Sequence, residues 1–253
     1  MKIFAPFLAA ALATQSWAAP TLYLAGDSTM ASGGGGSGTQ GFGVYLPNSF
    51  SGITVVNKAI GGRSARSYWN EGRFQAIADV VKAGDYVLIE FGHNDGGSLS
   101  TTDNGRTACF GGGTEVCISP TTGEKVYTYV FYLLQGAKLM TAKGAHVVIA
   151  SPTPNNLWES GTWGYTAPRF TAYGRTVVKN LGDLGAFVDH GLYVANEYKA
   201  LGGSAVNAFY PVDHTHTSPA GAQSVAGQFM KALMCGGSPL STYSTTSTSG
   251  TCY

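Results

Sequence analysis

Short apolar segments rich in β-branched residues alternate with helical patterns along this chain. Their apolarity is continuous rather than alternating, which is typical of strands buried on both faces of a parallel sheet. Apolar residues recur at helical spacing from 74 to 81 and from 130 to 140, and Gly84 and Gly144 follow as helix stop signals. The five predicted strands are Thr21–Gly26, Ile53–Ile60, Tyr86–Gly92, His146–Ser151 and Ala186–His190.

This order of elements predicts a doubly wound, three-layer α/β/α sandwich on a central five-stranded parallel sheet. A last helix is expected after Ser218, an N-cap residue, with Pro219 in its first turn. No internal repeat or linker divides the chain, so residues 19–253 are expected to form one domain. In such a sheet, functional residues gather in the loops at the carboxyl ends of the strands.

The first 18 residues have the pattern of a secretory signal peptide. A positive Lys2 precedes an apolar run from 3 to 13, and Ser16-Trp17-Ala18 is a small-x-small cleavage pattern that predicts a cut after Ala18. The apolar run is too short to span a bilayer. We therefore expect a secreted, extracellular protein that does not bind a membrane.

Secretion makes the four cysteines interpretable. An even number of cysteines in an oxidising compartment favours disulfides, and the chain has no CxxC spacing that would favour zinc. Four cysteines allow three pairings, and the residues alone do not choose among them. The four are Cys109, Cys117, Cys235 and Cys252.

Composition excludes one large class of partner. Charged residues are 11% of the chain, with 15 basic and 14 acidic side chains, and removal of the segment containing Lys2 leaves a balance of zero. The protein therefore has no basic field with which to bind nucleic acid. Glycine is abundant, with 36 residues, and the glycine-rich stretch at 32–38 predicts a mobile loop beside the site rather than a phosphate cradle.

Several residues that could carry chemistry follow the predicted strands directly. Ser28 comes after the first strand, where it is either a nucleophile or a helix cap, and Asn94 comes after the third, where it is either an oxyanion donor or a turn residue. Asp213 and His216 lie three residues apart before the last helix, so the carboxylate could orient the imidazole. Each signal is weak by itself, because all four residue types are also common in loops.

Together, the blocks resemble the SGNH (GDSL-type) hydrolase family in order and in spread along the chain. The first block ends in Ser-Thr rather than the usual Ser-Leu, a variant that is similar to the fungal rhamnogalacturonan acetylesterases of that family. The four blocks are Gly26-Asp27-Ser28-Thr29, Gly61-Gly62-Arg63-Ser64, Gly92-His93-Asn94-Asp95 and Asp213-His214-Thr215-His216.

The resemblance implies the SGNH hydrolase fold and a role for each matching residue. Ser28 is the implied nucleophile and His216 the base, with Asp213 orienting His216. The Ser28 N–H, the Gly62 N–H and the Asn94 side chain form the implied oxyanion hole. A glycine at 62 is consistent with this role, because it permits close backbone approach.

The resemblance also implies an activity and its setting. The expected enzyme is a secreted, monomeric serine esterase that removes acetyl groups from rhamnogalacturonan, an acidic plant polysaccharide, without a cofactor or metal. The four cysteine positions also suit the two local disulfides of the fungal rhamnogalacturonan acetylesterases, and this resemblance implies the pairs Cys109–Cys117 and Cys235–Cys252.

Three residues near these blocks are hypothesised to bind substrate. Arg63 and Arg66 lie in an interval without acidic residues that also contains Ser28 and Gly62, so one of the two arginines could hold a uronate carboxylate. The alternative is that both pair with carboxylates elsewhere in the protein. His93, beside Asn94, is the third candidate.

Other functions remain open at this stage. Within the family, a xylan acetylesterase or a lipase is possible. Outside it, Asp213, His214 and His216 could hold the metal of a metal-dependent hydrolase, or the protein could bind pectin without catalysis.

Overall fold

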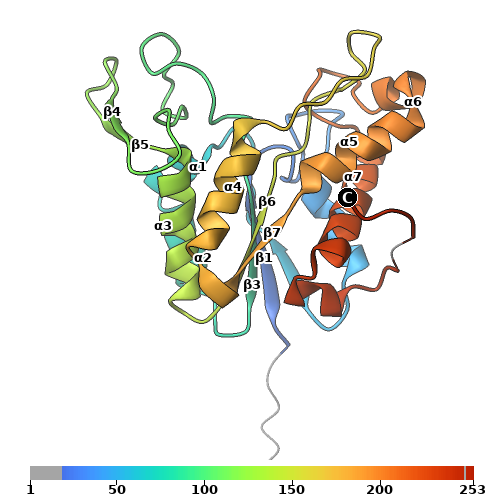
Figure 1. Ribbon diagram of the computed structural model, residues 1–253, viewed down its shortest axis with the longest axis horizontal. Helices are drawn as coiled ribbons and strands as arrows, with labels where there is room; N and C mark the ends of the chain where they lie inside the picture. Colours follow the sequence, from blue (N-terminus) through green and yellow to red (C-terminus); the bar gives the residue numbers. More distant parts are fainter. Residues whose placement is uncertain (1–18, 248) are drawn as a thin grey trace, which may run out of the picture.

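Five parallel strands form the central sheet of the computed structural model, which describes residues 19–247 and 249–253 (Figure 1). The predicted signal peptide, residues 1–18, lies outside the described residues. The strand order is β2-β1-β3-β6-β7. This confirms the predicted five-stranded parallel α/β architecture. The strands are β1 (Thr21–Gly26), β2 (Thr54–Asn57), β3 (Tyr86–Glu90), β6 (His146–Ala150) and β7 (Gly185–Val188).

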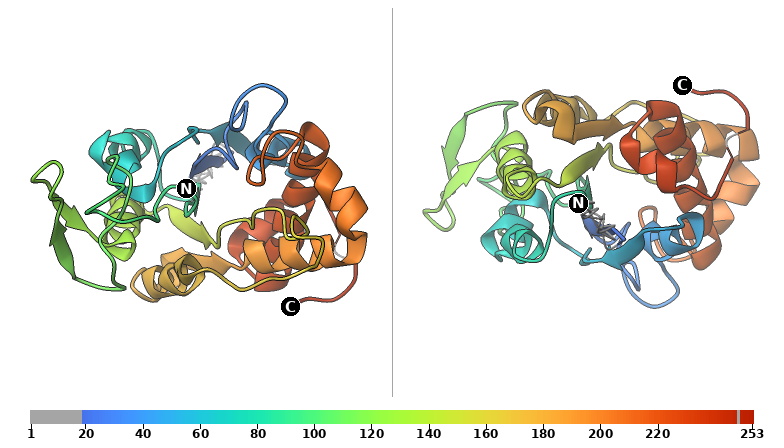
Figure 2. Two further views of the ribbon diagram at one scale, coloured as in Figure 1. Left: turned by 90° about the horizontal axis from the view of Figure 1, so that it is seen from above. Right: turned by 90° about the horizontal axis from the view of Figure 1, so that it is seen from below.

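Helices cover both faces of this sheet, and the apolar strands explain why. Every residue of β3 is buried, with Val87 and Ile89 in one hydrophobic cluster and Tyr86 and Leu88 in the other. The first cluster includes residues of α1 (Ala65–Asn70), α2 (Arg73–Ala78), α3 (Tyr129–Thr141) and α4 (Arg169–Lys179). The second includes residues of α5 (His190–Leu201), α6 (Gly203–Ala208) and α7 (Pro219–Gly236). Figure 2 shows the two groups of helices on opposite sides of the strands.

Some boundaries differ from the sequence expectation for local reasons. The second strand ends at Asn57 rather than Ile60, shortly before the glycine turn at 61–62. The N–H of Ile60 still donates to the Gly26 carbonyl, at 3.0 Å. The last helix begins as predicted, and the Ser218 side chain accepts from the Gly221 N–H.

An antiparallel hairpin and four short 3-10 helices complete the described elements. The hairpin, β4 (Val116–Ile118) with β5 (Lys125–Tyr127), projects above the sheet beside α3 (Figure 1). The Cys109–Cys117 disulfide ties it to the preceding loop, and Cys235–Cys252 joins α7 to the tail. Both pairs are those that the resemblance implies. The 3-10 helices are Phe42–Val44, Leu46–Ser49, Gly182–Leu184 and Pro239–Tyr243.

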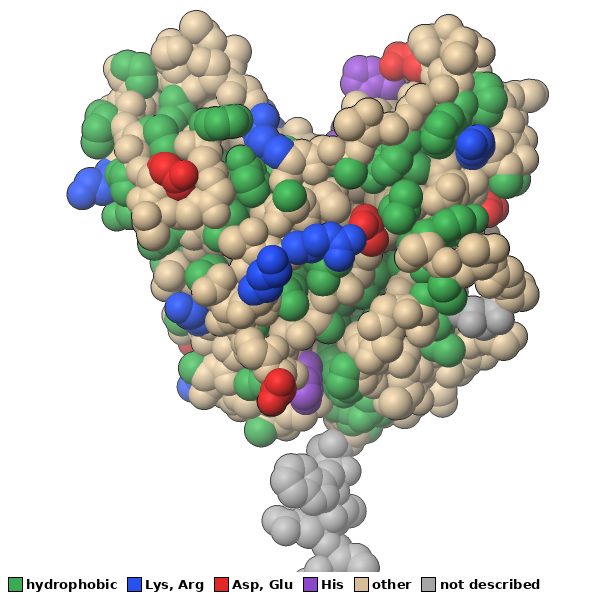
Figure 3. Space-filling model, viewed as in Figure 1, with side chains coloured by type: hydrophobic (Ala, Val, Ile, Leu, Met, Phe, Trp, Pro, Cys, Tyr) green, Lys and Arg blue, Asp and Glu red, His purple; other side chains and the backbone are tan. Residues whose placement is uncertain are grey.

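The strand order creates a switch point beside β1. The chain leaves β1 for β2 on one side and later enters β3 on the other, so loops from all three strands meet at one edge. Figure 3 shows a deep hollow above this edge, between two projecting parts of the molecule. Within the described residues, no helix is both long and apolar enough to cross a membrane.

Candidate active site

Ser28 lies two residues beyond the end of β1, in a turn fixed by its neighbour. The Asp27 carboxylate accepts from both the N–H and the hydroxyl of Thr29, at 2.9 and 2.8 Å. Ser28 is nearly buried, and its Oγ is 2.8 Å from Nε2 of His216. These two residues, 188 positions apart in sequence, are therefore in direct hydrogen-bond contact.

Asp213 determines which nitrogen of His216 carries the proton. Its Oδ2 is 2.7 Å from Nδ1 of His216, and an ionised carboxylate can only accept a hydrogen bond. Nδ1 therefore donates, which leaves Nε2 of the neutral ring as an acceptor for the Ser28 hydroxyl. This is the tautomer that a base acting on Ser28 requires.

The same carboxylate is held in its ionised form. Burial by itself raises the pKa of Asp213, but hydrogen bonds from the His216 ring and from the His216 and Thr215 N–H groups outweigh this effect. The pKa of Asp213 falls to about 2. Asp213 therefore remains an acceptor throughout the neutral range.

Two other loops hold the segment that carries His216. The Asn156 N–H donates to the His214 carbonyl at 2.7 Å, and the Thr215 hydroxyl donates to the Asn155 side chain at 3.0 Å. On the other side, the Gln40 N–H donates to the Thr217 carbonyl at 2.8 Å. The imidazole is therefore positioned from both flanks of its loop.

The glycine-rich stretch packs directly on the imidazole. A Cβ added at Gly35 would lie 2.5–2.6 Å from three ring atoms of His216. The buried Thr39 hydroxyl fixes this loop by accepting from the Gly35 N–H and donating to the Gly36 carbonyl, at 2.9 and 2.7 Å. The stretch thus lies beside the site, as expected, and its glycine leaves room for the ring.

The three predicted oxyanion donors come from loops after three neighbouring strands. Gly62 follows β2, Ser28 follows β1 and Asn94 follows β3. Across residues 19–247 and 249–253, the N–H groups of Ser28 and Gly62 donate to no protein acceptor. Gly62 has φ +74°, a conformation that favours glycine, and its neighbour Gly61 packs against the Ser28 side chain.

Arg106 is a residue of this site that sequence reasoning missed. Its Nη1 donates to Oδ1 of Asn94 at 3.2 Å and to the Gly62 carbonyl at 3.3 Å. With Oδ1 engaged, Nδ2 of Asn94 is the donating atom, and one of its protons goes to the Arg63 carbonyl at 3.1 Å. One guanidinium therefore contacts two of the three predicted donor residues. Arg106 lies 44 positions from Gly62 in sequence, so no local pattern links it to the site.

The expectation that Arg66 binds substrate is wrong. Its side chain has no exposed surface, and its guanidinium donates to Asp103 at 2.9 Å, to Glu124 at 2.5 Å and to the Thr107 carbonyl at 2.8 Å. A buried cation needs such partners because its desolvation is costly. Arg66 therefore anchors the loop on either side of Arg106 and is not available to a ligand.

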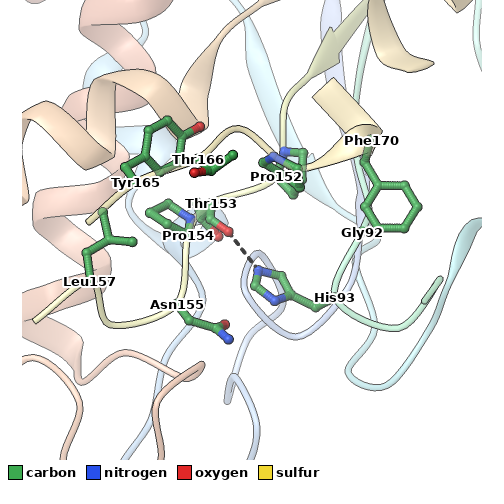
Figure 4. A pocket seen from close by; sticks show the side chains of 11 residues that line it. Gly92, His93, Pro152, Thr153, Pro154, Asn155, Leu157, Tyr165, Thr166 and Phe170 are labelled. Atoms are coloured by element: carbon green, nitrogen blue, oxygen red, sulfur yellow. Dashed lines mark hydrogen bonds between the residues drawn. The ribbon is translucent and has the colours of Figure 1, made fainter. Parts of the chain in front are cut away.

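The other two substrate-binding candidates lie near the surface. Arg63 is about one-third exposed, but its Nε is paired with Glu71 at 3.1 Å and its Nη1 donates to the Gly61 carbonyl. His93 lines a pocket of about 270 Å³, where its Nε2 donates to the Thr153 carbonyl at 2.9 Å (Figure 4). Pro152, Pro154 and other apolar side chains form much of this pocket.

The three residues considered as metal ligands do not converge. Asp213 bonds His216, whereas His214 turns towards Glu159, at 3.4 Å. Across residues 19–247 and 249–253, no cluster of three histidine, cysteine or acidic side chains is arranged to hold a metal ion.

This chain is similar to known hydrolases in sequence and in fold. A family model described as GDSL-like lipase/acylhydrolase matches residues 24–223. The rhamnogalacturonan acetylesterase of Emericella nidulans is 55% identical over 221 residues, which cover 87% of this chain and 86% of that protein. The probable rhamnogalacturonan acetylesterase YesY of Bacillus subtilis is 29% identical, over 87% of this chain and 94% of that protein.

Among solved structures, the acetylxylan esterase Axe2 of Geobacillus stearothermophilus superposes with a TM-score of 0.57 at 19% identity. The match covers 85% of this chain and 94% of that one. At this identity, the likeness supports the fold alone.

Proposed function

The chain belongs to the GDSL-like lipase/acylhydrolase family, and on that premise we propose that it removes acetyl groups from rhamnogalacturonan, with Ser28 as nucleophile. One observation carries the chemistry. The Ser28 hydroxyl, the His216 ring and the Asp213 carboxylate form a continuous hydrogen-bonded chain, with separations of 2.8 and 2.7 Å. In the same site, the N–H groups of Ser28 and Gly62 have no acceptor among the described residues.

The reaction starts when His216 removes the hydroxyl proton of Ser28. Serine is a weak nucleophile until a base takes this proton, and Asp213 stabilises the imidazolium that forms. Ser28 Oγ then bonds to the acetyl carbonyl carbon, and the carbonyl π electrons move to its oxygen.

The resulting oxyanion is stabilised by the N–H groups of Ser28 and Gly62 and by Nδ2 of Asn94. Such donors act where negative charge develops, so they stabilise the transition state more than the substrate. When the intermediate collapses, the bond to the sugar oxygen breaks and His216 returns its proton to that oxygen. Water, activated by the same imidazole, then hydrolyses the acetyl-serine to acetate and restores Ser28.

The substrate assignment rests on the 55% identity to the Emericella nidulans enzyme. That protein is a rhamnogalacturonan acetylesterase by name, so acetylated rhamnogalacturonan is the first substrate to test. Secretion is part of the proposal, and the two disulfides support it because such bonds form in oxidising compartments.

Acetate release from rhamnogalacturonan tests the proposal, with acetylated xylan as the alternative substrate. We expect Ser28→Ala to bind the polysaccharide but to lose at least about 10³-fold in kcat, as removal of a catalytic nucleophile typically does. Ser32→Ala, which changes an exposed serine near the same site, is the matched control. Substantial turnover by Ser28→Ala, or a preference of the wild type for xylan, would contradict the proposal.

A further inference from the structure

Two arginines near the proposed active site have no acidic partner. The chain has six arginines, and four of them have a carboxylate oxygen within 4 Å. Within residues 19–247 and 249–253, Arg106 and Arg169 do not. Arg106 donates to Asn94 and Gly62, as described above. Arg169 therefore remains as the arginine whose charge has neither an acidic partner nor a polar acceptor in the described protein.

Two aromatic rings hold the Arg169 guanidinium. Its Cζ lies 4.9 Å from the centre of the Phe170 ring and 5.4 Å from that of Phe110. Stacking on rings fixes a guanidinium in orientation and leaves its edge N–H groups able to donate. A planar cation held in this way matches a carboxylate, which can accept two parallel hydrogen bonds from it.

Packing brings this cation close to the loop that carries Asn94. The Phe170 ring lines the His93 pocket, and a Cβ added at Gly92 would lie 3.3 Å from it (Figure 4). The charge of Arg169 also acts electrostatically on the Asp95 carboxyl group. Burial raises the pKa of Asp95 well above its ordinary value, and Arg169 is among the groups that oppose this rise.

Phe110 gives this position an open aromatic face. Its side chain is 76% exposed, which is the largest value among the large apolar side chains of the described residues. The neighbouring Cys109 is fixed by its disulfide and by donation from its N–H to the Tyr127 carbonyl at 2.9 Å. An exposed ring in a fixed loop, beside a cation with no carboxylate partner among the described residues, suits a ligand that has both an apolar face and a negative charge.

We propose that Arg169, held over the rings of Phe110 and Phe170, binds the carboxylate of a uronic acid residue in the polysaccharide chain whose acetyl group lies at Ser28. Phe110 contacts a face of the same sugar. This inference rests on the proposed function, and it assigns recognition of the acidic sugar to α4 and the loop at Phe110 rather than to Arg63 or Arg66.

The test compares acetylated rhamnogalacturonan fragments with the same fragments after reduction of their carboxyl groups to alcohols. We expect Arg169→Gln to lower the ratio of kcat/KM on the acidic to the reduced substrate about tenfold, mainly through KM, since a charge-assisted hydrogen bond is lost. Arg169→Lys, which keeps the charge but not the planar fork, should give an intermediate ratio.

Arg175→Gln is the matched control. Arg175 lies on the same helix and also stacks on an aromatic ring, Phe187 at 4.1 Å, but it has its own partner in Asp189. This variant should keep the wild-type ratio. An unchanged ratio in Arg169→Gln, or an equal loss of kcat/KM on both substrates, would overturn this inference and leave the proposed function standing. A wild type that releases no acetate from either fragment would instead overturn the proposed function.

Discussion

The contact between Gly35 and His216 makes a single added methyl group a sharp test of the site. In Gly35→Ala, the new Cβ would lie 2.5–2.6 Å from three imidazole atoms. Ordinary contacts of a Cβ lie at 3.4–4 Å, so a gap of about 1 Å must open. Either the loop or the ring must move.

The ring is expected to move more than the loop. Thr39 bonds two groups of the loop, and the Gly33 N–H donates to the Gln40 side chain at 2.6 Å. Within residues 19–247 and 249–253, the hydrogen bonds of the ring are those with Asp213 and Ser28 at its two nitrogens. A misplacement of about 1 Å in a catalytic group typically lowers the rate about 10²-fold. We therefore expect kcat to fall about 10²-fold, with little change in Tm because Gly35 is exposed.

Two quantities are measured: the melting temperature, and kcat on a short-chain aryl acetate. This substrate needs no polysaccharide-binding site. Gly164→Ala is the control, since it adds the same methyl group in a loop where nothing lies within 4 Å. A folded Gly35→Ala variant with wild-type kcat would refute the reasoning, because it would show that the loop yields and that the ring is not constrained by it.

Three further changes test other parts of the site. Arg106→Leu should lower kcat on the same aryl acetate about tenfold, since the Asn94 amide loses a donor that fixes it; a folded variant with normal kcat would exclude this positioning role. Arg66→Met should destabilise the fold by about 3 kcal/mol and lower Tm by about 6–12 °C, because Asp103 remains buried without its cation; a change in KM without a change in Tm would argue against its structural role. The lowered pKa of Asp213 stabilises the folded state. This contribution is complete above pH 3.8, the ordinary pKa of an aspartate, and is lost as the pH falls towards about 2. The stability advantage of the wild type over Asp213→Asn in urea unfolding should therefore shrink across that window, and a constant difference would contradict it.

Local sequence signals predicted the elements that depend on local chemistry. The first strand has the predicted bounds, Thr21–Gly26, because its apolar run forms an interior strand with β2 and β3 on its two sides. The last helix begins at Pro219 because Ser218 caps it. The order of the four sequence blocks also identified the residues whose geometry now supports a serine mechanism.

Residues whose role depends on distant partners could not be predicted in this way. Arg63 and Arg66 carry the same charge three positions apart, yet one is partly exposed and the other is buried against Asp103 and Glu124. The two arginines differ because the loop at 103–107 and the hairpin pack against Arg66 and supply its acidic partners. The contact of Gly35 with His216 likewise joins residues that are 181 positions apart by their numbers.

The residues of the site fall into two groups along the sequence, one on each side of the hairpin. Ser28, Gly62 and Asn94 all precede the hairpin, whereas Asp213 and His216 follow it. In the proposed mechanism, the first half of the chain thus supplies the nucleophile and the oxyanion donors, and the second half supplies the groups that move the proton. The exposed turn of the hairpin, residues 121–123, separates the halves. We therefore expect that cutting the chain there leaves two fragments that are each inactive and that regain activity only when they reassemble.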